Sequence, residues 1–145
     1  MREALDALLA QTFTDFELII SDNASTDRTE EICREYAAKD RRIRYVRQET
    51  NRGATANFQY VLDEAVGEYF MWAAHDDWWD PNFIQELALL LDHDIMAVVA
   101  FCRMQHVHVG GEVFKTYPNI TLVSPKKTSK ELLLPQVLED FYFKI

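Results

Sequence analysis

The alternation of short apolar runs with amphipathic helical stripes constrains the fold of this chain most. Apolar runs of strand length occupy residues 16–20, 43–46, 69–74 and 95–101. Between and before them, apolar side chains recur at helical spacing within residues 2–11, 27–37, 58–65 and 83–91. Strands that alternate with helices predict an α/β fold, in which helices flank a mostly parallel sheet.

The two ends of the chain depart from this alternation. A sheet of this class begins with a strand, whereas residues 2–11 predict a helix, so we expect the first strand and its loop to be missing. Further along, residues 105–109 and 112–117 flank Gly110-Gly111 and predict a β-hairpin. The apolar and acidic residues 131–145 predict one helix.

Charge and cysteine usage narrow the class of protein. The net charge is −9, with 15 Lys and Arg against 24 Asp and Glu, which argues against a nucleic-acid partner. The two cysteines lie far apart and form no disulfide framework, which favours a cytoplasmic location. The longest apolar runs, such as 95–102, are far shorter than the ~20 residues of a membrane-spanning helix. We therefore expect membrane association only through a segment of a longer form.

Polar clusters follow the predicted strands at residues 21–27, 51–53 and 75–77. Ligands of open parallel sheets bind outside the carboxyl ends of the strands. Right-handed crossovers place those ends on one edge of the sheet. The order of the clusters therefore predicts that they converge on one crevice.

Asp76 and Asp77 are the sharpest chemical feature. Adjacent carboxylates repel each other, and a hard divalent cation such as Mg²⁺ or Mn²⁺ relieves that repulsion together with substrate phosphates. Such a cation would stabilise a departing diphosphate. The alternative is a solvated turn that caps the helix after Pro81.

The other polar residues each have two interpretations. Asp22 either accepts hydrogen bonds from a base or sugar, or forms an Asx-turn. Ser25 suits helix capping better than ligand contact. Arg52 either reaches a phosphate past Gly53 or is an ordinary surface arginine, and Asn57, one helical turn further on, faces the same crevice.

The aromatic and histidine residues carry less weight. Trp78 and Trp79 either form a platform for an acceptor sugar or fill the core, and the second role is more common after a turn. His106 and His108 alternate along one strand, but no third metal ligand lies near them in the sequence.

The motifs together resemble family-2 glycosyltransferases, which have the GT-A, Rossmann-like fold. The resemblance runs from about Arg2 to Phe83. It rests on residues 2–13, on Ser21-Asp22-Asn23-Ala24-Ser25-Thr26-Asp27 after the strand, on 51–57, and on 72–81 with His75-Asp76-Asp77. It implies a donor-binding half over residues 1–104 and the incomplete start of an acceptor-side region over residues 105–145.

The resemblance also implies a reaction: inverting transfer of a sugar from a nucleoside-diphosphate sugar, with a UDP-sugar as first choice. The acceptor hydroxyl would belong to a saccharide or a lipid-linked acceptor, and Mn²⁺ or Mg²⁺ would be the cofactor. By this resemblance Asp22 contacts the nucleobase, Asp76 contacts the ribose and Asp77 holds the metal. The implied nucleotide-binding set is Asp22, Asn23, Ser25, Arg52, Gly53, Asn57 and Asp76, and the implied metal ligands are Asp77 and Asp76.

The chain departs from the family pattern in three ways. The opening strand with its nucleotide-contacting loop is absent, and Ala74 stands where many members have a further aspartate. A general base must lie within hydrogen-bond reach of the attacking hydroxyl. Glu139 and Asp140 are weak candidates for it, and we expect the base to lie beyond Ile145.

Two other functions remain open from the sequence. One is a sugar-phosphate nucleotidyltransferase, which uses a similar sheet. The other is a non-catalytic fragment that associates with other chains, or with itself, through exposed edges.

Overall fold

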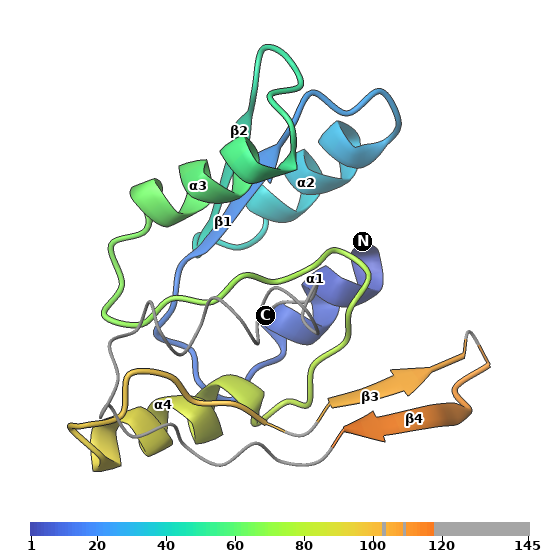
Figure 1. Cartoon of the computed structure of the whole chain (residues 1–145). Helices are drawn as coiled ribbons and strands as arrows, with labels where there is room; N and C mark the ends of the chain where they lie inside the picture. The colour runs from blue at the N-terminus through green and yellow to red at the C-terminus, as the bar shows by residue number, and fades with distance from the viewer. Residues whose placement is uncertain (103, 109, 118–145) are drawn as a thin grey trace. The chain divides into compact units, whose positions relative to one another are not determined.

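A computed structural model describes residues 1–102, 104–108 and 110–117 (Figure 1). The chain divides into two compact units, with the boundary between Pro81 and Asn82. The first unit contains α1 (Arg2–Leu9), β1 (Leu18–Asp22), α2 (Thr29–Ala37), β2 (Ile43–Arg47) and α3 (Ala54–Glu64). The second contains α4 (Phe83–His93), β3 (Met104–Val107) and β4 (Val113–Tyr117).

A parallel pair of strands organises the first unit. β1 and β2 run in register from Leu18 beside Ile43 to Asp22 beside Arg47. α2 packs against both strands and α3 packs against β1, as the upper part of Figure 1 shows. The predicted α/β class is therefore confirmed: a small parallel sheet flanked by helices.

The buried face of α1 comes from its apolar spacing. Ala4, Leu5, Ala7 and Leu8 are all less than 10% exposed, which is the stripe expected of a helix that covers a core. The stripe continues past the end of the helix to Gln11, a polar residue that is only 3% exposed. From α2 the core receives Cys33, which is fully buried.

Two predicted strands are wrong. Residues 69–74 and 95–101 have no strand assignment, although both runs are apolar. A strand is stable only beside a partner that accepts its backbone hydrogen bonds, and β1 is bonded to β2 alone in the sheet formed by the described residues. In a doubly wound sheet, the strand that opens the fold lies between the next strand along the chain and the fourth one. Here these two flanking strands correspond to β1 and to residues 69–74. No described strand fills that position, so residues 69–74 have no strand to pair with.

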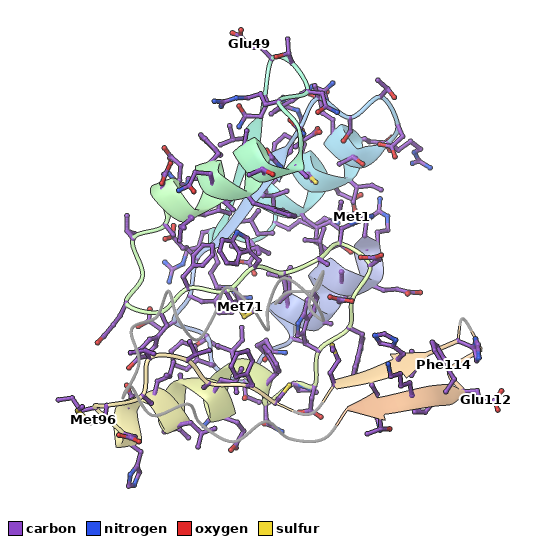
Figure 2. All side chains as sticks on the ribbon, in the orientation of Figure 1. Met1, Glu49, Met71, Met96, Glu112 and Phe114 are labelled. Atoms are coloured by element: carbon purple, nitrogen blue, oxygen red, sulfur yellow. The ribbon has the colours of Figure 1, made fainter. Side chains whose placement is uncertain are left out.

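The second unit contains the predicted hairpin. β3 and β4 are antiparallel, with a bulge between His106 and Val107. Gly111 has a φ of +84°, which suits glycine, and Glu112 lies at this turn (Figure 2). The rings of His108 and Phe114 lie 4.5 Å apart, so His108 has an aromatic packing role.

Two predictions are not tested by the structure. The helix expected over residues 131–145, with Glu139 and Asp140, lies outside the described residues. The functional division between residues 1–104 and 105–145 stays a prediction. Among the helices that the structure describes, none is long and apolar enough to cross a bilayer.

Candidate functional site

The first two polar clusters meet at the carboxyl ends of β1 and β2. The side chain of Asn23 accepts a hydrogen bond from the backbone N–H of Arg52 at 2.8 Å and donates one to Asn51 Oδ1 at 3.0 Å. Asn51 Oδ1 also accepts from the backbone N–H of Gly53 at 2.9 Å. The loop after β2, whose outer tip is marked by Glu49 in Figure 2, is therefore fixed against the loop after β1. The sequence predicted this convergence.

A second set of contacts links α3 to the same edge. Ser21 Oγ donates to Asn57 Oδ1 at 2.6 Å, and Asn57 Nδ2 donates to the carbonyl of Ser21 at 2.9 Å. Gln48 Nε2 donates to Ser21 Oγ at 3.1 Å, and its backbone N–H donates to the carbonyl of Asp22 at 2.8 Å. Sequence reasoning missed Gln48. The sequence did carry a sign of its role, because Gln48 is the first residue after β2 and so lies at the edge of the sheet where ligands bind.

Gly53 opens the N-terminus of α3. Its φ of +81° and ψ of 162° define a region that is essentially restricted to glycine. A Cβ placed on Gly53 would meet nothing within 4 Å, so the space beside this backbone is open. The side chain of Arg52 is exposed, and Nη1 lies 3.5 Å from Gln48 Oε1. An open glycine beside an exposed guanidinium can accommodate an anion close to the backbone.

Asp22 is buried, and both of its carboxylate oxygens are engaged. Oδ1 accepts from the backbone N–H of Ser25 at 2.7 Å. Oδ2 accepts from Tyr45 Oη and from Arg47 Nη1, each at 2.8 Å. The side chain is 0% exposed, so Asp22 holds the 22–25 turn, as its structural interpretation predicted. Its contact with a nucleobase stays a prediction.

Electrostatics at Asp22 favour the ionised carboxylate. Burial raises its pKa, but the hydrogen bonds from Ser25, Tyr45 and Arg47 outweigh burial and hold the pKa of Asp22 below its ordinary value. Burial and the bond to Asp22 raise the pKa of Tyr45 to about 12. Sequence reasoning missed Tyr45 and Arg47, although alternate residues of a strand share a face and Arg47 lies beside Asp22 in the sheet register.

The third cluster occupies an exposed turn. The side chains of His75 and Asp76 are 70% and 67% exposed, and His75 Nδ1 lies 3.8 Å from Asp76 Oδ1. Within the part of the chain that the structure describes, no group of three or more His, Cys, Asp and Glu side chains could hold a metal. The contacts of His75 and Asp76 do not connect them to the first two clusters. The structure thus brings the first two predicted clusters together, and the convergence of the third cluster with them stays a prediction.

The two tryptophans after the turn have different environments. Trp79 is 5% exposed and fills the core, whereas Trp78 is 70% exposed. Trp78 lines an open groove with four residues of the α1 segment: Glu3, Asp6, Ala7 and Ala10. The core-filling interpretation therefore holds for Trp79, and a role of Trp78 as a platform for an acceptor sugar stays a prediction.

Comparison with known proteins gives a consistent family. The family model described as "Glycosyl transferase family 2" matches residues 1–143. A protein of Rickettsia typhi named an uncharacterized glycosyltransferase is 38% identical over 103 residues, which cover 70% of this chain and 31% of that protein. An uncharacterized protein of Mycobacterium bovis is 38% identical over 125 residues, which cover 83% of this chain and 36% of that protein.

A third relative is more distant. Glycosyltransferase GlyA of Streptococcus pneumoniae is 33% identical over 87 residues, which cover 60% of this chain and 12% of that protein. The chain spans about a third of the length of the first two relatives. Its small parallel sheet with flanking helices is consistent with a GT-A-like, Rossmann-like fold. By its sequence match and its architecture, this chain belongs to glycosyl transferase family 2.

Proposed function

We propose that this chain forms the donor-binding part of a metal-dependent, inverting glycosyltransferase. The donor is a nucleoside-diphosphate sugar, with a UDP-sugar as first choice, and the acceptor is a hydroxyl of a saccharide or a lipid-linked molecule. One observation carries the proposal: Asn23 bonds the backbone of Arg52 at the carboxyl ends of two parallel strands, in a chain of this family.

The diphosphate requires positive partners because the protein carries a net charge of −9. The N-terminus of α3 has no side-chain cap, so its backbone N–H groups and the helix dipole favour an anion there. Gly53 leaves room for close approach, and Arg52 adds a charge beside it. This corner of the site suits a phosphate.

The acidic pair supplies the donor atoms for a cation. The side chain of Asp76 is 67% exposed, and His75 Nδ1 lies 3.8 Å from its Oδ1. The described residues offer no all-protein cage. Mg²⁺ and Mn²⁺ bind through one or two carboxylates and complete their shell with water and substrate phosphates. The residues present fit that mode of binding.

These placements support the following roles of the residues in the reaction. Asp77 and Asp76 would hold Mn²⁺ or Mg²⁺, which as a Lewis acid supports the negative charge that develops on the leaving diphosphate. Arg52 and the first turn of α3 orient the phosphates. Asp22, through Ser25, Tyr45 and Arg47, fixes the loop that faces the nucleobase. The general base is expected outside residues 1–117.

Location and assembly belong to the same proposal. A cytoplasmic protein is expected, with membrane association in a longer form. Self-association is expected through apolar side chains that stay exposed in the first unit: Phe58 at 54%, Leu62 at 39% and Val66 at 87%. Sedimentation velocity at rising concentration tests this, and a single monomeric species at all concentrations would contradict it.

Titration calorimetry tests the donor site. UDP in the presence of Mn²⁺ should bind the wild-type chain, and Asp77→Asn should weaken that binding at least tenfold. Asp15→Asn is the control because it removes the same charge at an exposed position outside the acidic segment, and its affinity should equal that of the wild type. Absence of Mn²⁺-dependent UDP binding in the wild type contradicts the proposal. Pyrophosphate release from a nucleoside triphosphate and a sugar phosphate would favour a nucleotidyltransferase instead.

A further inference from the structure

Gln11 and Thr12 connect the end of α1 to the segment that carries Asp76 and Asp77. We propose that they are positioning residues, which hold this acidic segment in the conformation that binds the cation and the diphosphate. The inference rests on the proposed function and adds residues to it that make no contact with the ligand themselves.

The contacts form a clamp across 69 positions of sequence. Gln11 Nε2 donates to the carbonyl of Asp80 at 2.7 Å and to the carbonyl of Ala7 at 3.2 Å. The backbone N–H of Thr12 donates to the carbonyl of Pro81 at 2.8 Å, and Thr12 Oγ1 donates to the same carbonyl at 3.2 Å. One amide group therefore bridges the last turn of α1 and the acidic segment.

The burial of Gln11 shows that the clamp is specific. Gln11 is 3% exposed and continues the apolar stripe of α1. A buried amide is costly unless its donors are bonded. A leucine or methionine could fill this position without any polar partner. The glutamine instead bonds one carbonyl of its own helix and one of the acidic segment.

The clamp lies close enough to Asp77 to control it. Asp80 follows Asp77 by three residues, which span at most ~11 Å when fully extended. Between them Trp79 is buried, and Pro81 has a fixed φ. The backbone is thus held at residues 79–81, immediately after the carboxylates. A misplacement of a reacting or binding group by ~1 Å can cost up to ~100-fold. Even a small shift of the backbone at residues 79–81 should therefore change the measured affinity.

Three variants, Gln11→Met, Thr12→Val and Gln11→Glu, test the clamp in the intact chain. Gln11→Met keeps the volume and removes the donor, whereas Thr12→Val, at an exposed position, removes the bond from Oγ1 to Pro81 and keeps the bond from the backbone N–H. Tyr36→Phe is the control, because it deletes the bond from Tyr36 Oη to Asp6 Oδ1, which ties α1 to α2 at 2.7 Å and leaves the acidic segment untouched. Calorimetry measures the affinity for UDP with Mn²⁺ and the affinity for uridine without metal.

We expect Gln11→Met to weaken Mn²⁺-dependent UDP binding about tenfold and Thr12→Val to weaken it less. Uridine binding should stay within twofold, and Tyr36→Phe should match the wild type in both. Gln11→Glu supplies a readout that general loosening would not give. A carboxylate cannot donate to the two carbonyls, but a protonated carboxyl can donate to one. The affinity of Gln11→Glu for UDP with Mn²⁺, relative to that of the wild type, should therefore recover as the pH falls.

The outcomes distinguish the positioning role of Gln11 and Thr12 from the proposed donor-binding function. If the wild type binds UDP with Mn²⁺ and both Gln11→Met and Thr12→Val bind equally well, the positioning role is overturned alone. An equal loss in Tyr36→Phe also overturns it, because the effect then follows from loosening α1. Absence of Mn²⁺-dependent binding in the wild type overturns the proposed function. If Gln11→Met does not fold, Thr12→Val and the pH dependence of Gln11→Glu decide.

Discussion

Replacement of Asp22 by asparagine tests the central structural feature of the first unit. The carboxylate is fully buried, and it accepts from Ser25, Tyr45 and Arg47 at 2.7–2.8 Å. Asparagine keeps the shape and one acceptor oxygen, so the bond from Ser25 can persist. The bonds to Oδ2 are lost, because an amide nitrogen cannot accept from Arg47 or Tyr45.

The expected loss of stability follows from these contacts. Breaking a buried ion pair by removing one partner costs ~3–5 kcal/mol. The cost of leaving Arg47 without Asp22 should lie at the low end of that range. The side chain of Arg47 is 31% exposed, and it keeps two other acceptors, Glu30 Oε2 at 3.3 Å and the carbonyl of Ser25 at 2.9 Å. We therefore expect Asp22→Asn to lower the free energy of unfolding by about 3 kcal/mol, a large part of the ~5–15 kcal/mol typical of a domain.

Urea unfolding at pH 7, followed by tryptophan fluorescence, measures this loss. All three tryptophans lie at positions 72–79, within the first unit. Arg28→Ala is the control, since the Arg28–Glu31 pair is exposed on both sides, and such pairs contribute at most ~1 kcal/mol. A loss below ~1 kcal/mol for Asp22→Asn would refute the reasoning, because exposed pairs reach that value.

Further predictions concern pH, the glycine at α3 and the acidic clamp. The pKa of Asp22 is lowered on folding, so its stabilisation is full above its unfolded pKa and is lost as the pH falls through the folded value. The pKa of Tyr45 is raised to about 12. The stability that Tyr45 contributes is therefore full below about pH 10 and is lost between about pH 10 and 12. The urea midpoint should fall between pH 9 and pH 11.5, and it should fall more for the wild type than for Tyr45→Phe. Gly53→Ala should cost ~1–3 kcal/mol from backbone strain alone, because a Cβ meets nothing there. The same urea assay measures it, and a loss well below ~1 kcal/mol would contradict this account. Gln11→Met should weaken Mn²⁺-dependent UDP binding about tenfold, as calorimetry would measure.

The sequence was sufficient for the elements with strong local signals. The apolar stripe of Leu5 and Leu8 predicted α1, and Gly110-Gly111 between two apolar runs predicted the hairpin. The alternation of strands and helices predicted a parallel sheet, which β1 and β2 form. Residues 69–74 show the limit, because an apolar run becomes a strand only when a neighbour is present, and that depends on contacts distant in sequence.

The candidate site was predictable in its position but not in its bonding. The loops at residues 21–27 and 51–53 were expected to converge, and Asn23 joins them. The full burial of Asp22 was not foreseeable, because it depends on Tyr45 and Arg47 from the neighbouring strand. The role of Gln11 was equally hidden, since its partner lies 69 residues away. Local patterns carry no information on such pairs.

Electron paramagnetic resonance of Mn²⁺ tests most directly whether Asp77 and a donor diphosphate share one cation. Free Mn²⁺ gives a sharp signal that falls on binding, so the chain with UDP should reduce it more than UDP alone or the chain with uridine. Asp77→Asn should remove that extra reduction, and Asp15→Asn should retain it. An equal signal for Asp77→Asn and the wild type in the presence of UDP would contradict the account, because the cation would then be held without this carboxylate.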